Sequence, residues 1–255
     1  MKEILKIIFA FLFAIAFVCI TSAQTNAADS LKQLLANEKD LTKQFDLNRQ
    51  IQRELLIKGK PDQSLQYINR LFTIAGQLNN DSLLMLSYFA KRTYCDYKTD
   101  SKEEIECTLK ALAIAEKKFP RSIPRAYLGL GSAYIDVHDY DLALSYLRNA
   151  LSIIQNKRLG QDSVINAIHA QLAIAFDFLE KPDSILHYEQ LVNEFLIKHP
   201  YHEFEKSMFC HTANAYSQLG NFKLAESFYQ NSIDEDTSSK SVVDAAAAGG
   251  YARFY

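Results

Sequence analysis

The chain has 255 residues, of which 28 are Lys or Arg and 30 are Asp or Glu, and its net charge is −2. This near-neutral balance excludes the strongly basic surface that a protein needs to follow a nucleic-acid backbone. The length is sufficient to bury a large core, either in one elongated unit or in two compact ones.

The first residues have the composition of an export signal. Lys2 and Lys6 form a basic start, and an apolar run follows at 7–20. The small residues that end at Ala23 suit cleavage after that residue. The run is shorter than the roughly 20 residues of a membrane-spanning helix, so we expect a cleaved signal peptide over 1–23 rather than an anchor. The sequence therefore predicts an exported protein, periplasmic or associated with the cell envelope of a Gram-negative-type bacterium.

The cysteines favour free thiols. Cys19 lies in the signal segment, and the bulky Val18 before it argues against a lipid-modified cysteine. Cys95, Cys107 and Cys210 are an odd number, which implies no disulfide framework. A bridge between Cys95 and Cys107 is the alternative in an oxidising compartment.

Helical periodicity dominates after a linker at 24–37, and sustained strand-type alternation is nearly absent. Turn-forming residues interrupt the helical pattern at intervals. They are Gly59-Lys60-Pro61, Pro120, Pro124, Gly160, Lys181-Pro182, Pro200 and Leu219-Gly220. The spacing predicts five pairs of antiparallel amphipathic helices over 38–235.

One stretch, 127–151, combines large apolar and small residues at fixed intervals. Its key positions are Tyr127, Leu130, Gly131, Tyr134, Ala143, Leu147 and Ala150. Gly131 and Ala143 would let two antiparallel helices approach closely, with Tyr134 and Leu147 filling the space beside them. This order of residues resembles the tetratricopeptide repeat.

The same order recurs along the chain. A second clear copy comprises Phe209, Ala213, Tyr216, Ala225, Tyr229 and Ser232. A looser copy, in which we expect a turn one residue shorter, comprises His169, Leu172, Ala173, Phe176, Ser184, Tyr188 and Leu191. Two weaker copies end at Leu71 and Ala111, so about five degenerate repeats follow one another with a period near 40 residues, against 34 in the standard repeat.

The resemblance implies an all-α fold, a right-handed superhelical α-solenoid of antiparallel helix pairs. In particular, we expect 124–157, 164–198 and 205–235 to form three successive hairpins layered side by side. Residues 236–255 are expected to be a linker and the first helix of an incomplete sixth repeat, which is either truncated or docked on another molecule.

No catalytic pattern is present in the sequence. It contains no GxSxG, HExxH or CxxC motif and no phosphate-binding glycine loop. His199 and His202 are the only close histidine pair, and Pro200 between them suggests a join rather than a metal site. His138 and Asp139 lie at a predicted turn, where polar residues cap helices. We expect no enzyme activity, no cofactor and no metal.

The resemblance also implies a concave groove, lined by the first helix of each pair, that binds a peptide or a helix of another protein. Carried over by position, the groove residues are Arg49, Arg53, Arg92, Arg125, Leu128, Ser132, Ile135, Ala170, Ile174, Phe178, Asn214 and Ser217. Asp177 and His211 occupy further groove positions. The Lys/Asn set of the family's carboxylate clamp is missing.

Four of these residues are arginines from the first three repeats. Because the guanidinium group presents a planar fork to carboxylates, the partner is expected to carry an acidic segment. The alternative is that the arginines are solvated and paired with Glu54, Asp96 or Asp136.

These features together predict an exported, non-catalytic interaction scaffold. The first alternative is the extracytoplasmic sensory portion of a membrane-spanning regulator, a histidine kinase or a helix-turn-helix transcriptional regulator, truncated at residue 255. The second is an enzyme whose site has no recognisable motif.

Overall fold

The structure is a computed structural model that describes residues 27–199 and 202–233, so the predicted signal peptide and the predicted sixth repeat lie outside the described part. The chain divides into two compact units between Lys98 and Thr99. The described helices of unit 1 are α2 (Ala27–Asn37), α3 (Leu41–Ile57), α4 (Pro61–Gln77) and α5 (Asp81–Tyr97). Those of unit 2 are α6 (Ser101–Lys118), the 3₁₀ turn η1 (Pro120–Ser122), α7 (Ile123–Asp136), α8 (Tyr140–Lys157), α9 (Asp162–Phe178), α10 (Pro182–Lys198), α11 (His202–Gln218) and α12 (Phe222–Ile233).

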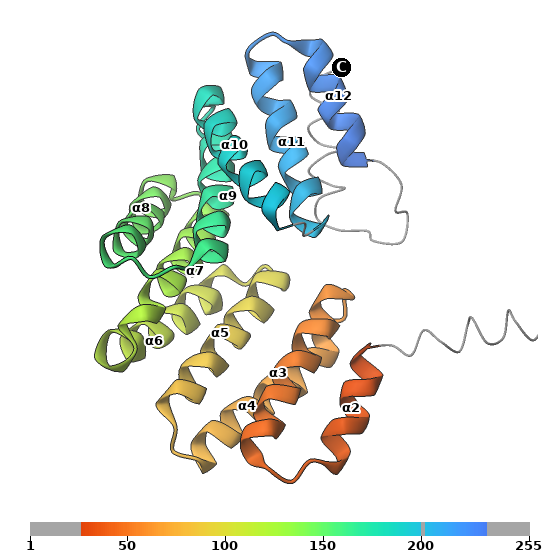
Figure 1. The fold of residues 1–255 in the computed structure, drawn as a ribbon, viewed down its shortest axis with the longest axis vertical. Helices are drawn as coiled ribbons and strands as arrows, with labels where there is room; N and C mark the ends of the chain where they lie inside the picture. The colour runs from red at the N-terminus through yellow and green to blue at the C-terminus, as the bar shows by residue number, and fades with distance from the viewer. Residues whose placement is uncertain (1–26, 200–201, 234–255) are drawn as a thin grey trace, which may run out of the picture. The chain divides into compact units, whose positions relative to one another are not determined.

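The all-α prediction is confirmed: within 27–199 and 202–233 every regular element is a helix (Figure 1). None of the described helices combines the length and the apolar character needed to cross a bilayer. The unit boundary falls between α5 and α6, which the sequence assigned to one helix pair.

Side-chain caps fix where several helices begin. The carboxylates of Asp40, Asp100 and Asp139 each accept a hydrogen bond from the backbone N–H three residues on, at 2.9–3.1 Å. Proline opens α4 and α10, at a position where a helix needs no N–H donor. Asp139 is therefore a helix cap, as the sequence predicted.

The turn inside each helix pair has the same three-residue geometry. Its second residue has positive φ, 64° at Gly59, 64° at His138, 53° at Glu180 and 75° at Gly220. The third residue donates its N–H back to the carbonyl five positions earlier, as in Asp139 to Tyr134 at 2.9 Å. This is the left-handed cap that ends many helices and reverses the chain.

The three predicted hairpins of unit 2 are confirmed as α7–α8, α9–α10 and α11–α12, here called hairpins 1, 2 and 3. Neighbouring hairpins contact each other through α8 and α9 and through α10 and α11. The first helices also meet directly, since α9 contacts both α7 and α11 (Figure 1).

The register predicted for α10 was wrong by one residue. The turn before α10 has three residues, 179–181, like the turns of hairpins 1 and 3, so it is not shortened. The helices α4, α8, α10 and α12 each bury their fourth, eighth and eleventh residues. In that order of helices these are Ser64, Ile68 and Leu71; Ala143, Leu147 and Ala150; Ile185, Glu189 and Val192; and Ala225, Tyr229 and Ser232. In hairpin 2 these positions belong to Ile185, Glu189 and Val192, not to Ser184, Tyr188 and Leu191.

An aromatic triplet recurs in all three hairpins of unit 2. A ring on the second helix lies between two rings of the first helix, with centroids 5.5–6.0 Å apart. The triplets are Tyr127–Tyr146–Tyr134, His169–Tyr188–Phe176 and Phe209–Phe228–Tyr216. Such offset pairs add to the energy of apolar burial. Hairpin 2 differs because a histidine takes the place of a tyrosine or phenylalanine.

Hairpin 1 shows why a small residue lies where two helices cross. A Cβ atom added to Gly131 would be 2.6 Å from Cγ of Leu147, closer than unbonded carbons approach. Leu147 has no exposed surface and belongs to a core that also includes Leu172 of α9. The close approach predicted at Gly131 is confirmed.

Unit 1 has its own core, formed by α3, α4 and α5. Phe45, Leu71, Ile74 and Ala75 are buried there together with Ala90. Cys95, Cys107 and Cys210 are buried and none of them is in a disulfide bond, in agreement with the sequence prediction.

Candidate functional site

The predicted groove residues of unit 2 lie on α7, α9 and α11, the first helices of hairpins 1, 2 and 3. We call the surface that these residues form the first-helix face. Leu128, Ser132, Ile174 and Ser217 are partly buried there, and Phe178 is 53% exposed. The others differ: Ile135 and Ala170 are only 3% and 2% exposed and mainly contribute packing beneath the face.

Phe178 belongs to an aromatic stack at one end of this face. Its ring is stacked on Tyr140 at 5.4 Å, and the His138 ring lies within about 6 Å of both. The stack joins the end of α9 to the turn of hairpin 1, which gives His138 a structural contact.

The predicted arginine group is divided between the two units. Arg49 and Arg53 are exposed on α3, and Arg92 is partly buried on α5. Arg49 lies 3.8 Å from Asp46 on the same helix. Arg125 is exposed on α7 of unit 2. Three of the four arginines therefore belong to unit 1 and one belongs to unit 2.

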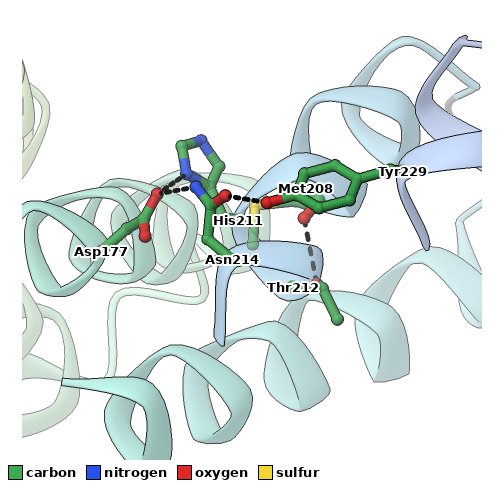
Figure 2. A network of polar contacts seen from close by, with 6 residues as sticks. All are labelled: Asp177, Met208, His211, Thr212, Asn214 and Tyr229. Atoms are coloured by element: carbon green, nitrogen blue, oxygen red, sulfur yellow. Dashed lines mark hydrogen bonds and ion pairs between the residues drawn. The ribbon is translucent and has the colours of Figure 1, made fainter. Parts of the chain in front are cut away.

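The strongest polar feature of the first-helix face joins α9 to α11. Oδ2 of Asp177 accepts a hydrogen bond from Nδ2 of Asn214 at 2.7 Å and lies 2.9 Å from Nδ1 of His211 (Figure 2). The side chains of Asp177 and His211 are 12% and 17% exposed. All three residues therefore lie close to the surface in fixed orientations.

Asn214 is held from its other side as well. The hydroxyl of Tyr229 on α12 donates to Oδ1 of Asn214 at 2.5 Å (Figure 2). A carboxamide has two N–H donors and two acceptor lone pairs. Two of these four sites are used by Asp177 and Tyr229, which leaves Asn214 one donor and one acceptor for another molecule.

The sequence identified part of this network and missed part. Asp177, His211 and Asn214 were assigned to the groove by position, and the structure brings them together. Tyr229 was treated only as a core residue, because an aromatic residue at its repeat position gives no sign that the hydroxyl has a polar partner.

The sequence argued against a metal site at His199 and His202. His199 is the C-cap residue that follows α10, its ring lies tilted against Phe195 with centroids 4.6 Å apart, and His202 begins α11. The prediction that no metal binds there stays a prediction.

Comparison with known proteins supports the repeat assignment. The sequence profile of the tetratricopeptide repeat matches residues 124–157 and 207–238, which correspond to hairpins 1 and 3. No curated protein matches the chain.

Several solved structures have a similar fold. The signal transduction ATPase with a tetratricopeptide repeat sensor from Pyrococcus horikoshii matches with a TM-score of 0.62 and 19% identity, over 92% of this chain and 36% of that one. NprR in complex with its cognate peptide NprX matches with a TM-score of 0.64 and 11% identity, over 99% of this chain and 73% of that one. BtubC from P. vanneervenii matches with a TM-score of 0.58 and 16% identity, over 90% and 91%.

At these identities the likeness shows the fold alone, and this chain spans about a third of the archaeal ATPase. The profile matches nevertheless fall on hairpins 1 and 3, whose helix pairs carry the repeat positions found in the sequence. Residues 124–157 and 207–238 therefore match the tetratricopeptide repeat, within an all-α fold similar to solved structures that contain such repeats.

Proposed function

We propose that this chain is an exported, non-catalytic scaffold that binds a peptide or a helix of another protein on the first-helix face of unit 2. The observation that carries the proposal is the contact between Asp177 and Asn214, which presents a fixed amide with one donor and one acceptor still available. A peptide bond offers the complementary N–H and C=O, so Asn214 is suited to bind a main chain whatever its side chains are.

The apolar residues beside the network support the same proposal. Leu128 and Ile174 are partly buried, and Phe178 is largely exposed. Apolar contacts of this kind supply affinity to a peptide whose orientation is fixed by a few polar groups. NprR, a structure of similar fold, is itself described in complex with a peptide.

A blocking experiment tests the location of the site. Ser132 and Ser217 are small, partly buried residues of the first-helix face. Tyrosine at either position should fill the face without removing a network hydrogen bond. We expect capture of the partner from the native host, measured by quantitative mass spectrometry, to fall at least tenfold for Ser132→Tyr with Ser217→Tyr.

The matched control makes the same chemical change elsewhere. Ser145 is exposed on α8, a second helix. Ser145→Tyr should capture the partner as the wild type does. Equal loss in both variants, or in neither, would contradict binding on the first-helix face.

The finer description of the partner rests on the arginines. We propose that an acidic segment of the partner contacts Arg49, Arg53 and Arg92 in unit 1 and Arg125 in unit 2. Exchanging Arg53 and Arg92 for glutamate should weaken binding and reduce its dependence on salt. Unchanged affinity in that double variant would remove the acidic segment from the proposal.

Export rests on residues 1–23, which have a basic start, an apolar run and a small-residue end. Amino-terminal sequencing of the protein isolated from its host should start at Gln24 if the signal is cleaved after Ala23. An intact Met1 would contradict cleavage at this site.

A second candidate function is the sensory portion of a membrane-spanning regulator. It is favoured by the similarity to the archaeal signal transduction ATPase, whose repeats are described as a sensor. Immunoblotting of host membranes should then detect a product larger than 29.0 kDa that carries these repeats.

A further inference from the structure

A cavity of about 340 Å³ opens at the end of hairpin 2 that is remote from its turn. It lies between the first half of α9 and the second half of α10. Its lining residues are Asp162, Ile165, Asn166, His169, Leu191, Glu194, Phe195, Lys198 and His199. The volume is at the small end of the range of ligand pockets, roughly 300–1,000 Å³.

A buried amide lines this cavity, and its oxygen is covered and has no hydrogen-bond partner among the described residues. Asn166 is 5% exposed, and its Oδ1 accepts no hydrogen bond from any residue that the structure describes. Asn166 is the fifth residue of α9, and the fifth residues of α3 and α5 are the buried, apolar Phe45 and Met85. A buried amide oxygen that accepts no hydrogen bond costs stability unless something donates to it.

A second polar substitution lies beside Asn166. His169 takes the place that Tyr127 and Phe209 occupy in the aromatic triplets of hairpins 1 and 3. Burial, and to a smaller extent the nearby His187, lowers the pKa of His169. The imidazole is therefore uncharged at neutral pH and adds little electrostatic cost to an apolar ligand.

The remaining wall is apolar and aromatic, with charges at the rim. Ile165, Leu191 and Phe195 are partly buried along the cavity. Asp162, Glu194 and Lys198 are exposed. The cavity thus combines apolar residues, aromatic rings, exposed charged groups and one buried amide whose oxygen lacks a donor.

We propose that this cavity binds an aromatic ring that carries a hydrogen-bond donor, an indole or a phenol, and that the donor bonds to Oδ1 of Asn166 once the amide has turned toward the ring. Planar rings stack well on aromatic walls, and a buried indole N–H or phenol O–H needs an acceptor. The size of the cavity suits one such ring.

The cavity is a different site from the first-helix face. None of Ala170, Ile174, Asp177 or Phe178 lines it, although all four lie on the same helix α9. The proposal therefore does not depend on peptide binding at the face. The ring could belong to a small aromatic amine or to a tryptophan or tyrosine of a protein, and the probes below separate the two.

The absence of tryptophan from the chain permits a direct test. Indole can be excited at wavelengths where tyrosine does not absorb, so only the probe emits. Titrating the purified chain into N-acetyl-tryptophanamide should shift the emission to the blue and raise its anisotropy in a saturable manner. A linear, unsaturable response would overturn the proposal.

Methylation of the indole nitrogen tests the hydrogen bond on the wild-type protein. The 1-methyl analogue of the probe cannot donate, so its affinity should be about threefold to tenfold lower. Equal affinity of both probes would show that Asn166 does not accept from the ring and would overturn the assignment.

Asn166→Leu provides the complementary test. The variant should bind N-acetyl-tryptophanamide as weakly as the wild type binds the methylated analogue, with no further loss when both changes are combined. Its melting temperature should be equal to or higher than that of the wild type, because an unpaired buried amide is removed. Asn149→Leu, an exposed change on α8, should alter neither measurement.

A third probe, tryptamine, distinguishes the sources of the ring. Its ammonium group can pair with Asp162 or Glu194 at the rim. Tighter binding of tryptamine than of the blocked amide supports a small aromatic amine, and equal or weaker binding supports a side chain of a polypeptide. Failure of all three probes to bind would overturn the proposal.

Discussion

Hairpins 1 and 2 are neighbouring copies of the same motif, but their interiors differ. In hairpin 1, Gly131 lies against the fully buried Leu147, and the two helices are tightly packed. In hairpin 2 the corresponding residues are Ala173 and Glu189, and a cavity opens toward the end of the pair. The comparison teaches that the repeat pattern keeps the turn and the helix pairing while the interior chemistry varies.

The polar residues of hairpin 2 take the places of apolar or aromatic residues in hairpin 1. Glu189 is 8% exposed at the position of Leu147, and its Oε1 accepts a hydrogen bond from Asn193 at 3.0 Å. Asn166 and His169 replace apolar and aromatic residues in the same pair of helices. Three such departures in one hairpin argue for a role that packing alone does not explain.

Replacing Leu147 should cause the largest loss of stability among these tests. Leu147→Ala leaves a cavity in the tight hairpin and should lower the free energy of unfolding by about 2–5 kcal/mol. Urea unfolding followed by far-UV circular dichroism measures this loss. Arg148→Ala, an exposed change next to it, should stay within about 0.5 kcal/mol of wild type.

The close contact itself can be tested by a double-mutant cycle. Gly131→Ala should be unfavourable when Leu147 is present, because the new methyl group overlaps its side chain. In the Leu147→Ala background the same change should become stabilising, since alanine favours a helix and space is available. We expect a coupling energy of about 1–3 kcal/mol. Additive effects would mean that the two residues do not limit each other.

The reverse substitution, alanine to glycine, tests the equivalent position of hairpin 2. Ala173 is fully buried and packs with Val192 and Met208. Ala173→Gly should destabilise the protein by about 1–2 kcal/mol, because it loses a buried methyl group and helix propensity together. A neutral result in the same urea assay would indicate that hairpin 2 is as closely packed at this position as hairpin 1.

The smallest expected effect is a pH dependence confined to hairpin 2. Burial lowers the pKa of His169 below its usual value of 6.5, so below pH 6.5 the unfolded chain binds more protons than the folded one. The contribution of His169 to stability is therefore present above that pH and is lost as the pH falls. The His169→Phe variant carries the residue type found at Phe209 of hairpin 3. Its melting temperature should fall less than that of the wild type between neutral and mildly acidic pH. Parallel pH profiles would contradict this.

Much of the fold could be predicted from the sequence because small and aromatic residues recur with a fixed period. Gly131 with Leu147, the three hairpins and the cap at Asp139 follow directly from that recurrence. The register of α10 could not, because Tyr188 and Leu191 are more apolar than Glu189 and appear to a pattern search as better core residues. The three-residue turn, which is a backbone property, decides the register instead.

The residues of the candidate site were predicted from their repeat positions, but the contacts between them were not predicted. Asn214 and Asp177 lie where the repeat places groove residues, yet their hydrogen bond depends on side-chain directions that no spacing specifies. Asn166 was missed because a single asparagine in a helix has no sequence signature. It becomes noticeable only when α9 is aligned with α3 and α5, whose fifth residues are Phe45 and Met85.

The left-handed turns within the helix pairs have a practical consequence for engineering. Thr99, His138 and Glu180 adopt positive φ values of 55°, 64° and 53°, a conformation that glycine occupies without steric cost, as at Gly59 and Gly220. Thr99, being β-branched, bears the largest penalty. Glycine at Thr99 and Glu180 offers a route to a more heat-resistant protein whose ligand-contacting surfaces are left untouched.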